Sequence, residues 1–305
     1  MSRKINSAGF IIGLLGSIMF STKAIFVKLA FQNTHTDAVT LLSLRMLFSL
    51  PFYLVIALFF SNKQGTNRLS LKEWTGVALM GLFGYYISSL LDFIGLQFVS
   101  AGLERLILFL YPTFSVLINT FLFKTKLNKV QITALILTYI GIGIAYFGEL
   151  KLDTNNPKFF YGSFMIFLCS ITYSIYLVGT GRLVNKIGAT RYTAYAMLFA
   201  TLGIFFHFIS TKPISGLTLS TTLMGYSIAL ALIATVIPSF MISNAMKKIG
   251  SNNVSIITSI GPVSTILQAH FVLGEKILLE QIIGTLLVLV GVLLIGWKSN
   301  SIIVK

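Results

Sequence analysis

The chain is a succession of long apolar runs separated by short polar connectors. A helix of about 20 apolar residues is long enough to cross the hydrocarbon core of a bilayer. Runs such as residues 132–144 do not alternate between apolar and polar side chains, which excludes the strand pattern of a transmembrane β-barrel. The pattern therefore predicts an all-α membrane protein with ten transmembrane helices, at residues 9–31, 39–60, 76–98, 103–123, 130–147, 160–180, 192–209, 223–246, 254–273 and 278–297.

The composition agrees with this prediction. Of 305 residues, 55% are hydrophobic and 10% are charged, and the mean hydropathy is +0.88, whereas soluble domains carry about 25% charged residues. Ten spans use almost the whole length, so we expect the function to reside within the membrane. The single cysteine, Cys169, lies in an apolar run and indicates neither a disulfide framework nor a thiol-metal site.

Basic residues orient the predicted bundle. The net charge of +15 comes from cations scattered between apolar runs, not from a basic surface of the kind that binds nucleic acid. Lys and Arg in short loops are retained on the cytoplasmic side. If the N-terminus is cytoplasmic, the cytoplasmic side holds fifteen cations, namely Arg3, Lys4, Lys63, Arg68, Lys72, Lys124, Lys126, Lys129, Arg182, Lys186, Arg191, Lys247, Lys248, Lys298 and Lys305. The opposite loops hold only Lys151, Lys158, Lys212 and Lys276. Both termini are therefore predicted to be cytoplasmic.

The sequence also repeats itself. At an offset of 153, Gly9, Leu15, Ser17, Ile18 and Ser21 match Gly162, Leu168, Ser170, Ile171 and Ser174. At an offset of 150, Ile107, Pro112, Phe121, Lys126, Gln131, Ile132 and Gly141 match Ile257, Pro262, Phe271, Lys276, Gln281, Ile282 and Gly291. Each half has five predicted helices, and an odd number gives the second half the opposite orientation. This is the inverted repeat of many secondary transporters, whose substrate site lies between the repeats near the midplane.

The predicted organisation follows from these two patterns. Residues 1–8 form a cytoplasmic N-terminus, 9–148 a first repeat, 149–159 an outer linker, 160–297 a second repeat and 298–305 a cytoplasmic tail.

The last two predicted helices, GPVSTILQAHFVLGEKILLEQIIGTLLVLVGVLLIG, carry the clearest motif. It resembles the signature of the drug/metabolite transporter superfamily, specifically its ten-helix EamA-type members, through Pro262, Gly274, Glu275, Gln281, Gly284 and Gly291. The resemblance covers nearly the whole chain as two EamA-like repeats. The first repeat departs from the motif, with Lys124, Thr125 and Ala134 in place of Gly, Glu and Gly.

The resemblance implies a secondary transporter that exports or exchanges small organic metabolites by alternating access. Amino acids or related zwitterions are the first expectation for the substrate, and nucleotide-like or sulfonium compounds are the alternative. The expected partners are the small-molecule substrate, the lipid bilayer and protons as a candidate coupling ion, with no nucleic acid. We expect a multi-pass protein of the bacterial cytoplasmic (inner) membrane, monomeric or homodimeric, without a cofactor or metal.

Charged groups inside spans are costly and count as functional candidates. The first half holds all of them: Lys23, Arg45, Asp92, Glu104 and Arg105, with Lys28 near the outer end of its helix. One interpretation is a structural ion-pair network. The other is a binding site in which Lys23 or Arg45 binds a carboxylate, Asp92 pairs a substrate amine or carries a proton, and Glu104 is a second proton-coupling candidate.

Neutral polar residues complete the predicted site. Ser88 shares a helix face with Asp92, and Tyr111 and Ser115 share a face with Glu104. Pro112 and Pro262 are predicted to break their helices. The second half contributes only neutral groups, the candidates being Tyr173, Tyr176, Asn244, Thr258, Ser259 and Gln268. A wall of charges opposite a polar and aromatic wall suits a small zwitterion with an apolar side chain.

Enzyme motifs are absent: the sequence has no HExxH, no GxSxG and no P-loop. The chain is therefore not predicted to be an enzyme, and by itself it is no ATP-driven pump. Two other classes remain open, an intramembrane enzyme that uses the Asp92 and Glu104 carboxylates and a non-transporting membrane subunit.

Overall fold

The computed structural model describes residues 7–61, 69–123, 129–152, 156–212, 219–249, 254 and 257–299. All regular structure in these ranges is helical, which confirms the all-α class. The first half comprises α1 (Ser7–Thr34), α2 (Ala38–Ser61), α3 (Leu71–Gly81), η1 (Leu82–Ile87), α4 (Ser88–Leu96), α5 (Ala101–Leu108), α6 (Tyr111–Phe123) and α7 (Lys129–Leu152). The second half comprises α8 (Phe159–Ile187), α9 (Ala189–Thr211), α10 (Thr221–Ala231), η3 (Leu232–Val236), α11 (Ile237–Ile249), α13 (Gly261–Gln268), η4 (Ala269–Leu273) and α14 (Leu279–Ser299).

Helices occupy each of the ten predicted segments, but not all of them qualify as spans. Within the described residues, eight are long and apolar enough to cross a membrane, from Ser7–Thr34 to Thr221–Ala245. The ninth predicted segment holds α13 and η4, and the apolar part of α14, Leu279–Leu294, falls below span length. The structure therefore supports a multi-span helical protein, and the number ten stays a prediction.

Large apolar side chains cover the outside of this bundle. Phe121 is 86% exposed, Phe271 80% and Phe206 76%, on three different helices. Soluble monomers rarely expose large contiguous apolar patches. Exposed phenylalanines at many points of an apolar helical bundle indicate that lipid surrounds it.

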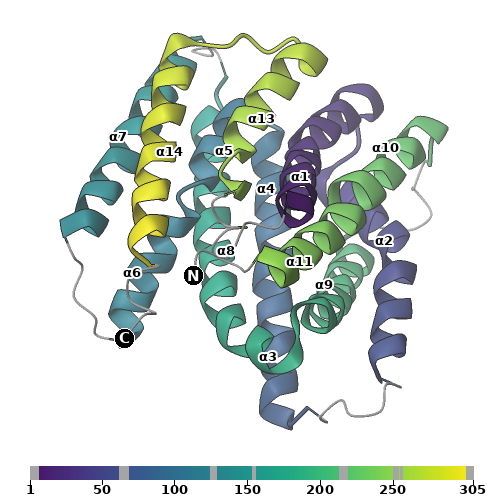
Figure 1. Cartoon of the computed structure of the whole chain (residues 1–305). Coiled ribbons are helices and arrows are strands. Elements are labelled where there is room, and N and C mark those ends of the chain that lie inside the picture. The colour runs from purple at the N-terminus through teal and green to yellow at the C-terminus, as the bar shows by residue number, and fades with distance from the viewer. Residues whose placement is uncertain are drawn as a thin grey trace.

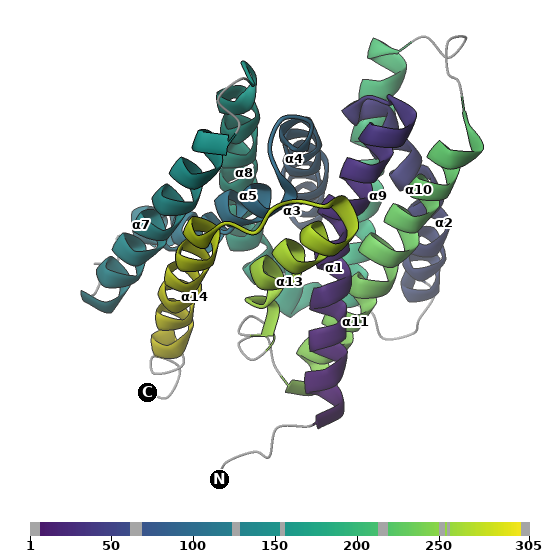
Figure 2. The same ribbon diagram turned by 90° about the horizontal axis from the view of Figure 1, so that it is seen from above.

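The helices form two groups around a central layer. In both Figure 1 and Figure 2, α7 and α14 lie side by side along one edge, and α2, α9 and α10 lie along the opposite edge. Helices α5 and α13 lie between these groups and contact each other, and α1 contacts α10, α11 and α13.

Close backbone contact joins α7 to α14. A Cβ atom at Gly141 would lie 2.6 Å from the carbonyl oxygen of Gly284, and a Cβ at Gly291 would lie 2.7 Å from the carbonyl oxygen of Ala134. The two contacts are related by the repeat offset of 150: Gly141 corresponds to Gly291, and Gly284 corresponds to Ala134. The partner number falls from 291 to 284 as the α7 number rises from 134 to 141, so the two helices are antiparallel.

A second pair of contacts shows the same relation. A Cβ at Gly13 of α1 would lie 3.3 Å from the Ala245 side chain of α11. The matching residues, at the offsets of 153 and 150 seen in the sequence, are Ile166 of α8 and Gly95 of α4, and these also touch. Small residues permit such close helix packing, so the glycines set how the two halves pack.

Two of the helix irregularities recur in both halves, whereas the π segment η4 has no counterpart in α6. The π segment η1 begins at Leu82 and η3 begins at Leu232, an offset of 150. Residues 109–110 interrupt the fourth predicted helix and residues 259–260 the ninth, again 150 apart. Pro112 and Pro262 lie in the first turn of the helices that follow these interruptions, α6 and α13.

The signature residues of the last two helices fix one end of the bundle. Gly274 has a φ of 71° and ends η4 in the left-handed region that favours glycine. The Glu275 carboxylate then accepts hydrogen bonds from the backbone N–H groups of Ala101 (2.9 Å) and Gly102 (3.4 Å), at the start of α5. Beside it, Gln281 of α14 donates to the Glu149 carboxylate of α7. The second half thus caps a helix of the first.

Asp37 caps the start of α2. Its carboxylate accepts hydrogen bonds from the N–H groups of Val39 (3.0 Å) and Thr40 (3.2 Å) and from the Thr40 hydroxyl (2.7 Å). Lys212, after α9, forms an ion pair with it at 3.1 Å. Partial burial alone would raise the pKa of Asp37, but the Thr40 hydrogen bonds and the Lys212 ammonium outweigh burial and hold this pKa below its usual range.

We therefore expect Asp37→Ala to lower the free energy of unfolding at neutral pH by about 1 kcal/mol, because the cap is lost. Since the pKa is lower in the folded state, the contribution is complete above the ordinary aspartate pKa of about 4 and disappears as the pH falls through the folded value. Thermal unfolding in detergent over a pH series should show the two proteins converging at acid pH. A difference that persists there contradicts the assignment.

Candidate functional site

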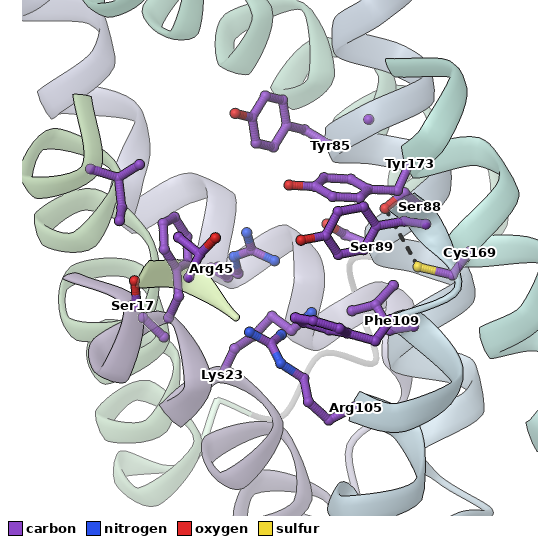
Figure 3. A pocket seen from close by; sticks show the side chains of 17 residues that line it. Ser17, Lys23, Arg45, Tyr85, Ser88, Ser89, Arg105, Phe109, Cys169 and Tyr173 are labelled. Atoms are coloured by element: carbon purple, nitrogen blue, oxygen red, sulfur yellow. Dashed lines mark hydrogen bonds between the residues drawn. The ribbon is translucent and has the colours of Figure 1, made fainter. Parts of the chain in front are cut away.

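A cavity of about 220 Å³ lies between the two halves of the chain. Helices α1, α2, α4, α5 and α6 and segment η1 form its first wall, and α8, η3, α11 and Thr258 form the second. Its lining residues are Ser17, Phe20, Lys23, Arg45, Gly84, Tyr85, Ser88, Ser89, Arg105, Leu108, Phe109, Tyr111, Cys169, Tyr173, Ala234, Ile242 and Thr258. Figure 3 shows the Lys23, Arg45 and Arg105 side chains directed into this space.

Lys23 belongs to a buried ion-pair group. Its Nζ atom lies 2.6 Å from Asp92 Oδ2 and 3.9 Å from Glu104 Oε1. The Asp92 and Glu104 side chains are 1% and 0% exposed, whereas Lys23 retains 17%. The lysine therefore separates both carboxylates from the cavity. Lys23 therefore combines features of both interpretations, because it forms ion pairs with the two carboxylates and also lines the cavity.

Arg45 enters the cavity from α2 without an acidic partner. Its Nε donates to the Thr235 hydroxyl at 2.9 Å, and its guanidinium lies 5.6 Å from the Phe93 ring centre. The residue is 5% exposed, and its Nη1 atom has no hydrogen-bond partner. A buried guanidinium with an unused donor has a strong requirement for an acceptor.

Arg105 enters from the end of α5, one turn before the helix interruption at 109–110. Its guanidinium lies against Gly261 of α13, where a Cβ would approach the Arg105 Nη2 atom to 2.8 Å. The Nε atom is buried without a hydrogen-bond partner. Glu104 points to Lys23 while its neighbour Arg105 points into the cavity, as the turn of about 100° per residue requires.

Aromatic rings form a continuous wall across both halves. The ring centres of Phe109 and Tyr111 are 5.4 Å apart, those of Tyr111 and Tyr173 5.2 Å, and those of Tyr173 and Tyr176 5.6 Å. Tyr85 of η1 continues the series with a hydroxyl 2.9 Å from that of Tyr176. Edge-to-face geometry dominates, which is a favourable arrangement of aromatic pairs.

Hydroxyl groups also line the cavity. They belong to Ser88 and Ser89 of α4, to Ser17 of α1 and to Thr258. The Ser88 hydroxyl lies 3.5 Å from the Cys169 sulfur of α8, the contact dashed in Figure 3. This contact joins the first half directly to the second.

The sequence-predicted residues divide into two sets. Those that line the cavity are Lys23, Arg45, Ser88, Tyr111, Tyr173 and Thr258. Those outside the lining are Asp92, Glu104, Ser115, Tyr176, Asn244, Ser259 and Gln268. Among the second set, Tyr176 backs the aromatic wall, Gln268 donates to Ser264 (2.8 Å) and the Ile18 carbonyl (3.4 Å), and Asn244 is exposed. The Ser115 hydroxyl is buried without a partner, and Ser259 is buried.

Sequence reasoning missed Tyr85, Ser17 and Ser89 as site residues. Arg105 was counted among the charges inside spans but was given no role in the predicted site, although it lines the cavity. Tyr85 carried no signal, because η1 changes the register of its helix, and a period of 3.6 residues does not predict which face a π segment presents.

Comparison with known proteins agrees over almost the whole length. A model described as the EamA-like transporter family matches residues 7–147 and 160–297. The uncharacterized transporter YcbK of Bacillus subtilis (strain 168) is 32% identical over 288 residues, which cover 91% of this chain and 89% of the relative. An uncharacterized transporter of Clostridium kluyveri is 22% identical, covering 96% and 94%. A solved crystal structure superposes with a TM-score of 0.67 at 16% identity, covering 97% of this chain and 99% of the other, which supports the fold alone.

Proposed function

Since the chain belongs to the EamA-like transporter family and is a multi-pass membrane protein, we propose that it is a secondary transporter that moves a small organic metabolite across the bacterial cytoplasmic membrane by alternating access. The cavity between its halves is the proposed substrate site. The family and the membrane location are the premise, and the mechanism and the site are the proposal.

The observation that carries the proposal is the cavity itself. It has charged, hydroxyl and aromatic walls in the interior of a bundle whose outside is apolar. Embedded charges are costly in a membrane and line substrate or ion pathways where they occur. A purely structural bundle has no need of a buried guanidinium without an acidic partner.

The repeated contacts support an inverted repeat, with units at residues 9–148 and 160–297. Helices α7 and α14 are antiparallel and touch at positions related by the sequence offset. A two-fold axis that exchanges antiparallel helices is perpendicular to them, and therefore lies in the membrane plane if they cross it. This symmetry is typical of carriers in which one repeat moves against the other around a central site.

The loop charges support the proposed orientation, with residues 1–8 and 298–305 cytoplasmic. One set of loops and termini holds fifteen cations and the other set holds four. Loops rich in Lys and Arg stay on the cytoplasmic side, so the first set is proposed to be cytoplasmic. A ten-span count is part of this proposal, because an even number brings both ends to the same side.

Transport is tested by counterflow in proteoliposomes. Vesicles are loaded with one unlabelled metabolite at a time, from amino acids, organic acids, nucleosides and sulfonium compounds, and the uptake of the labelled compound is followed. We expect accumulation for at least one class in vesicles that contain the protein and none in protein-free vesicles. A protein that accumulates no compound of the panel, and is not stabilised by any of them in detergent, contradicts the proposal.

A further inference from the structure

We infer that the cavity selects a small organic anion with an apolar or aromatic body and no amino group, such as a monocarboxylate. This inference rests on the proposed function and names the substrate class of the same site. It differs from the zwitterion expected from the sequence alone.

The charges that reach the cavity are all positive. Lys23, Arg45 and Arg105 line it, and no acidic side chain of the described residues does so. Asp92 and Glu104 lie behind Lys23, and none of their carboxylate oxygens is exposed. A substrate amine would have to displace Lys23 to reach Asp92. An amine in the open cavity would instead face three cations.

The positive charge is not fully compensated within the protein. Three cations and two carboxylates leave one net positive charge when all five groups are ionised. Lys23 forms both ion pairs of this group, and no ion pair joins Arg45 or Arg105 to a described residue. One carboxylate of the substrate would complete the balance.

Both arginines have an unused buried donor. Arg45 lacks a partner at Nη1 and Arg105 at Nε. A guanidinium presents several N–H groups in a plane, a geometry that matches the two oxygens of a carboxylate. Arg45 is 5% exposed, so its unused Nη1 donor is shielded from bulk water, and a carboxylate in the cavity would supply the acceptor that this donor lacks.

The remaining walls accommodate the rest of such an anion. Tyr111 and Tyr173 meet edge to face next to Phe109. In Figure 3, Tyr85 lies above Tyr173 and Phe109. Rings of this kind bury apolar or aromatic surface and keep a hydroxyl available for a polar substituent. The cavity therefore combines an anion-binding end with an apolar end.

Matched ligands separate the charge requirement from the shape requirement. Phenylpropionate is phenylalanine without its amine, and phenethylamine is phenylalanine without its carboxylate. Isocaproate, leucine and isoamylamine form the corresponding aliphatic series. Titration of each compound by thermal shift on the purified full-length protein gives apparent affinities, and these do not depend on how fast a weak acid diffuses through a bilayer.

We expect at least one carboxylate to bind about 10-fold more tightly than its amino acid, and neither amine to bind. In Arg45→Gln and Arg105→Gln the carboxylate affinity should fall about 30-fold, with partial recovery in Arg105→Lys. The control is Lys186→Gln, which removes one cation that is 72% exposed and paired with Glu73, far from the lining residues, and should leave affinity unchanged. If Arg45→Gln does not fold, the comparison of Arg105→Gln with Arg105→Lys tests the inference by itself.

An amino acid or amine that binds more tightly than its matched carboxylate overturns the inference, as does the absence of carboxylate binding in both series. Equal loss of affinity in Lys186→Gln also overturns it, because charge in general would then be responsible. Counterflow of amino acids with no preference for acids would leave the proposed function standing while the inference fails. Absence of counterflow for every compound would contradict the proposed function itself.

Discussion

Replacement of Asp92 by asparagine is expected to lower the free energy of unfolding by about 3–5 kcal/mol, the usual cost of removing one partner of a buried ion pair. Asp92 Oδ2 lies 2.6 Å from Lys23 Nζ in a setting where the carboxylate is 1% exposed. Without it, the lysine would keep only Glu104 at 3.9 Å. Thermal unfolding in detergent, followed by the fraction of protein that remains monodisperse after heating, measures the loss.

The matched control is Asp37→Asn. It removes the charge of another carboxylate that is paired with a lysine, but there the Asp37 and Lys212 side chains are 42% and 36% exposed. Exposed ion pairs contribute at most about 1 kcal/mol. Equal destabilisation by Asp92→Asn and Asp37→Asn would show that the Lys23 group is not a buried pair.

A triple variant separates structure from function. Replacing all three members of the group with apolar residues, Lys23→Met, Asp92→Leu and Glu104→Leu, should recover most of the stability, because no unpaired charge is left from this group. Substrate exchange should stay low, because a cavity cation has been removed. If variants that neutralise Lys23, Arg45 and Asp92 one at a time all transport as well as the unmodified protein, the assignment of these charges to a substrate site is wrong.

A second large effect is expected at the contact between Ser88 and Cys169. The substitution Ser88→Cys places two thiols where the oxygen and sulfur atoms are now 3.5 Å apart. One lies on α4 of the first repeat and the other on α8 of the second. Bridging them with Hg²⁺ should abolish substrate exchange, because movement of one repeat against the other is the basis of alternating access. Added dithiothreitol should restore exchange.

The chain offers a clean control for this experiment, because Cys169 is its only cysteine. Neither the unmodified protein nor Ser88→Cys combined with Cys169→Ala can form the bridge, and both should tolerate Hg²⁺. Mass spectrometry of the intact protein reports whether one mercury atom joins the two thiols. Full exchange by the bridged protein would show that α4 and α8 do not separate during transport.

Most of the helical architecture could be predicted because a membrane imposes length and apolarity on every span. Irregularities inside the spans could not. Leu82 and Leu232 begin π segments that share no sequence marker: η1 (LFGYYI) contains Gly84 and no proline, whereas η3 (LIATV) contains Thr235. A run of apolar residues predicts a span, but it does not predict where one turn of the helix is widened into a π turn.

The cost of burying a charge identified candidate residues but not which of them reach the cavity. Lys23 and Arg45 line the cavity, whereas Asp92 and Glu104, identified by the same cost, lie behind Lys23. Asn244 and Tyr176 are merely polar or aromatic, and helix position alone does not determine their direction. Asn244 is exposed, and Tyr176 lies behind the cavity wall.

The cap that Glu275 provides for α5 has a kinetic consequence. Any rearrangement that separates the halves at this end must expose the N–H groups of Ala101 and Gly102 and the carboxylate that binds them. The position matching Glu275 in the other repeat is Thr125, which has no charge to offer a helix terminus. We therefore expect separation of the halves at the Glu275 end to carry a cost of its own, and the rates at which the cavity opens to the two sides of the membrane to differ.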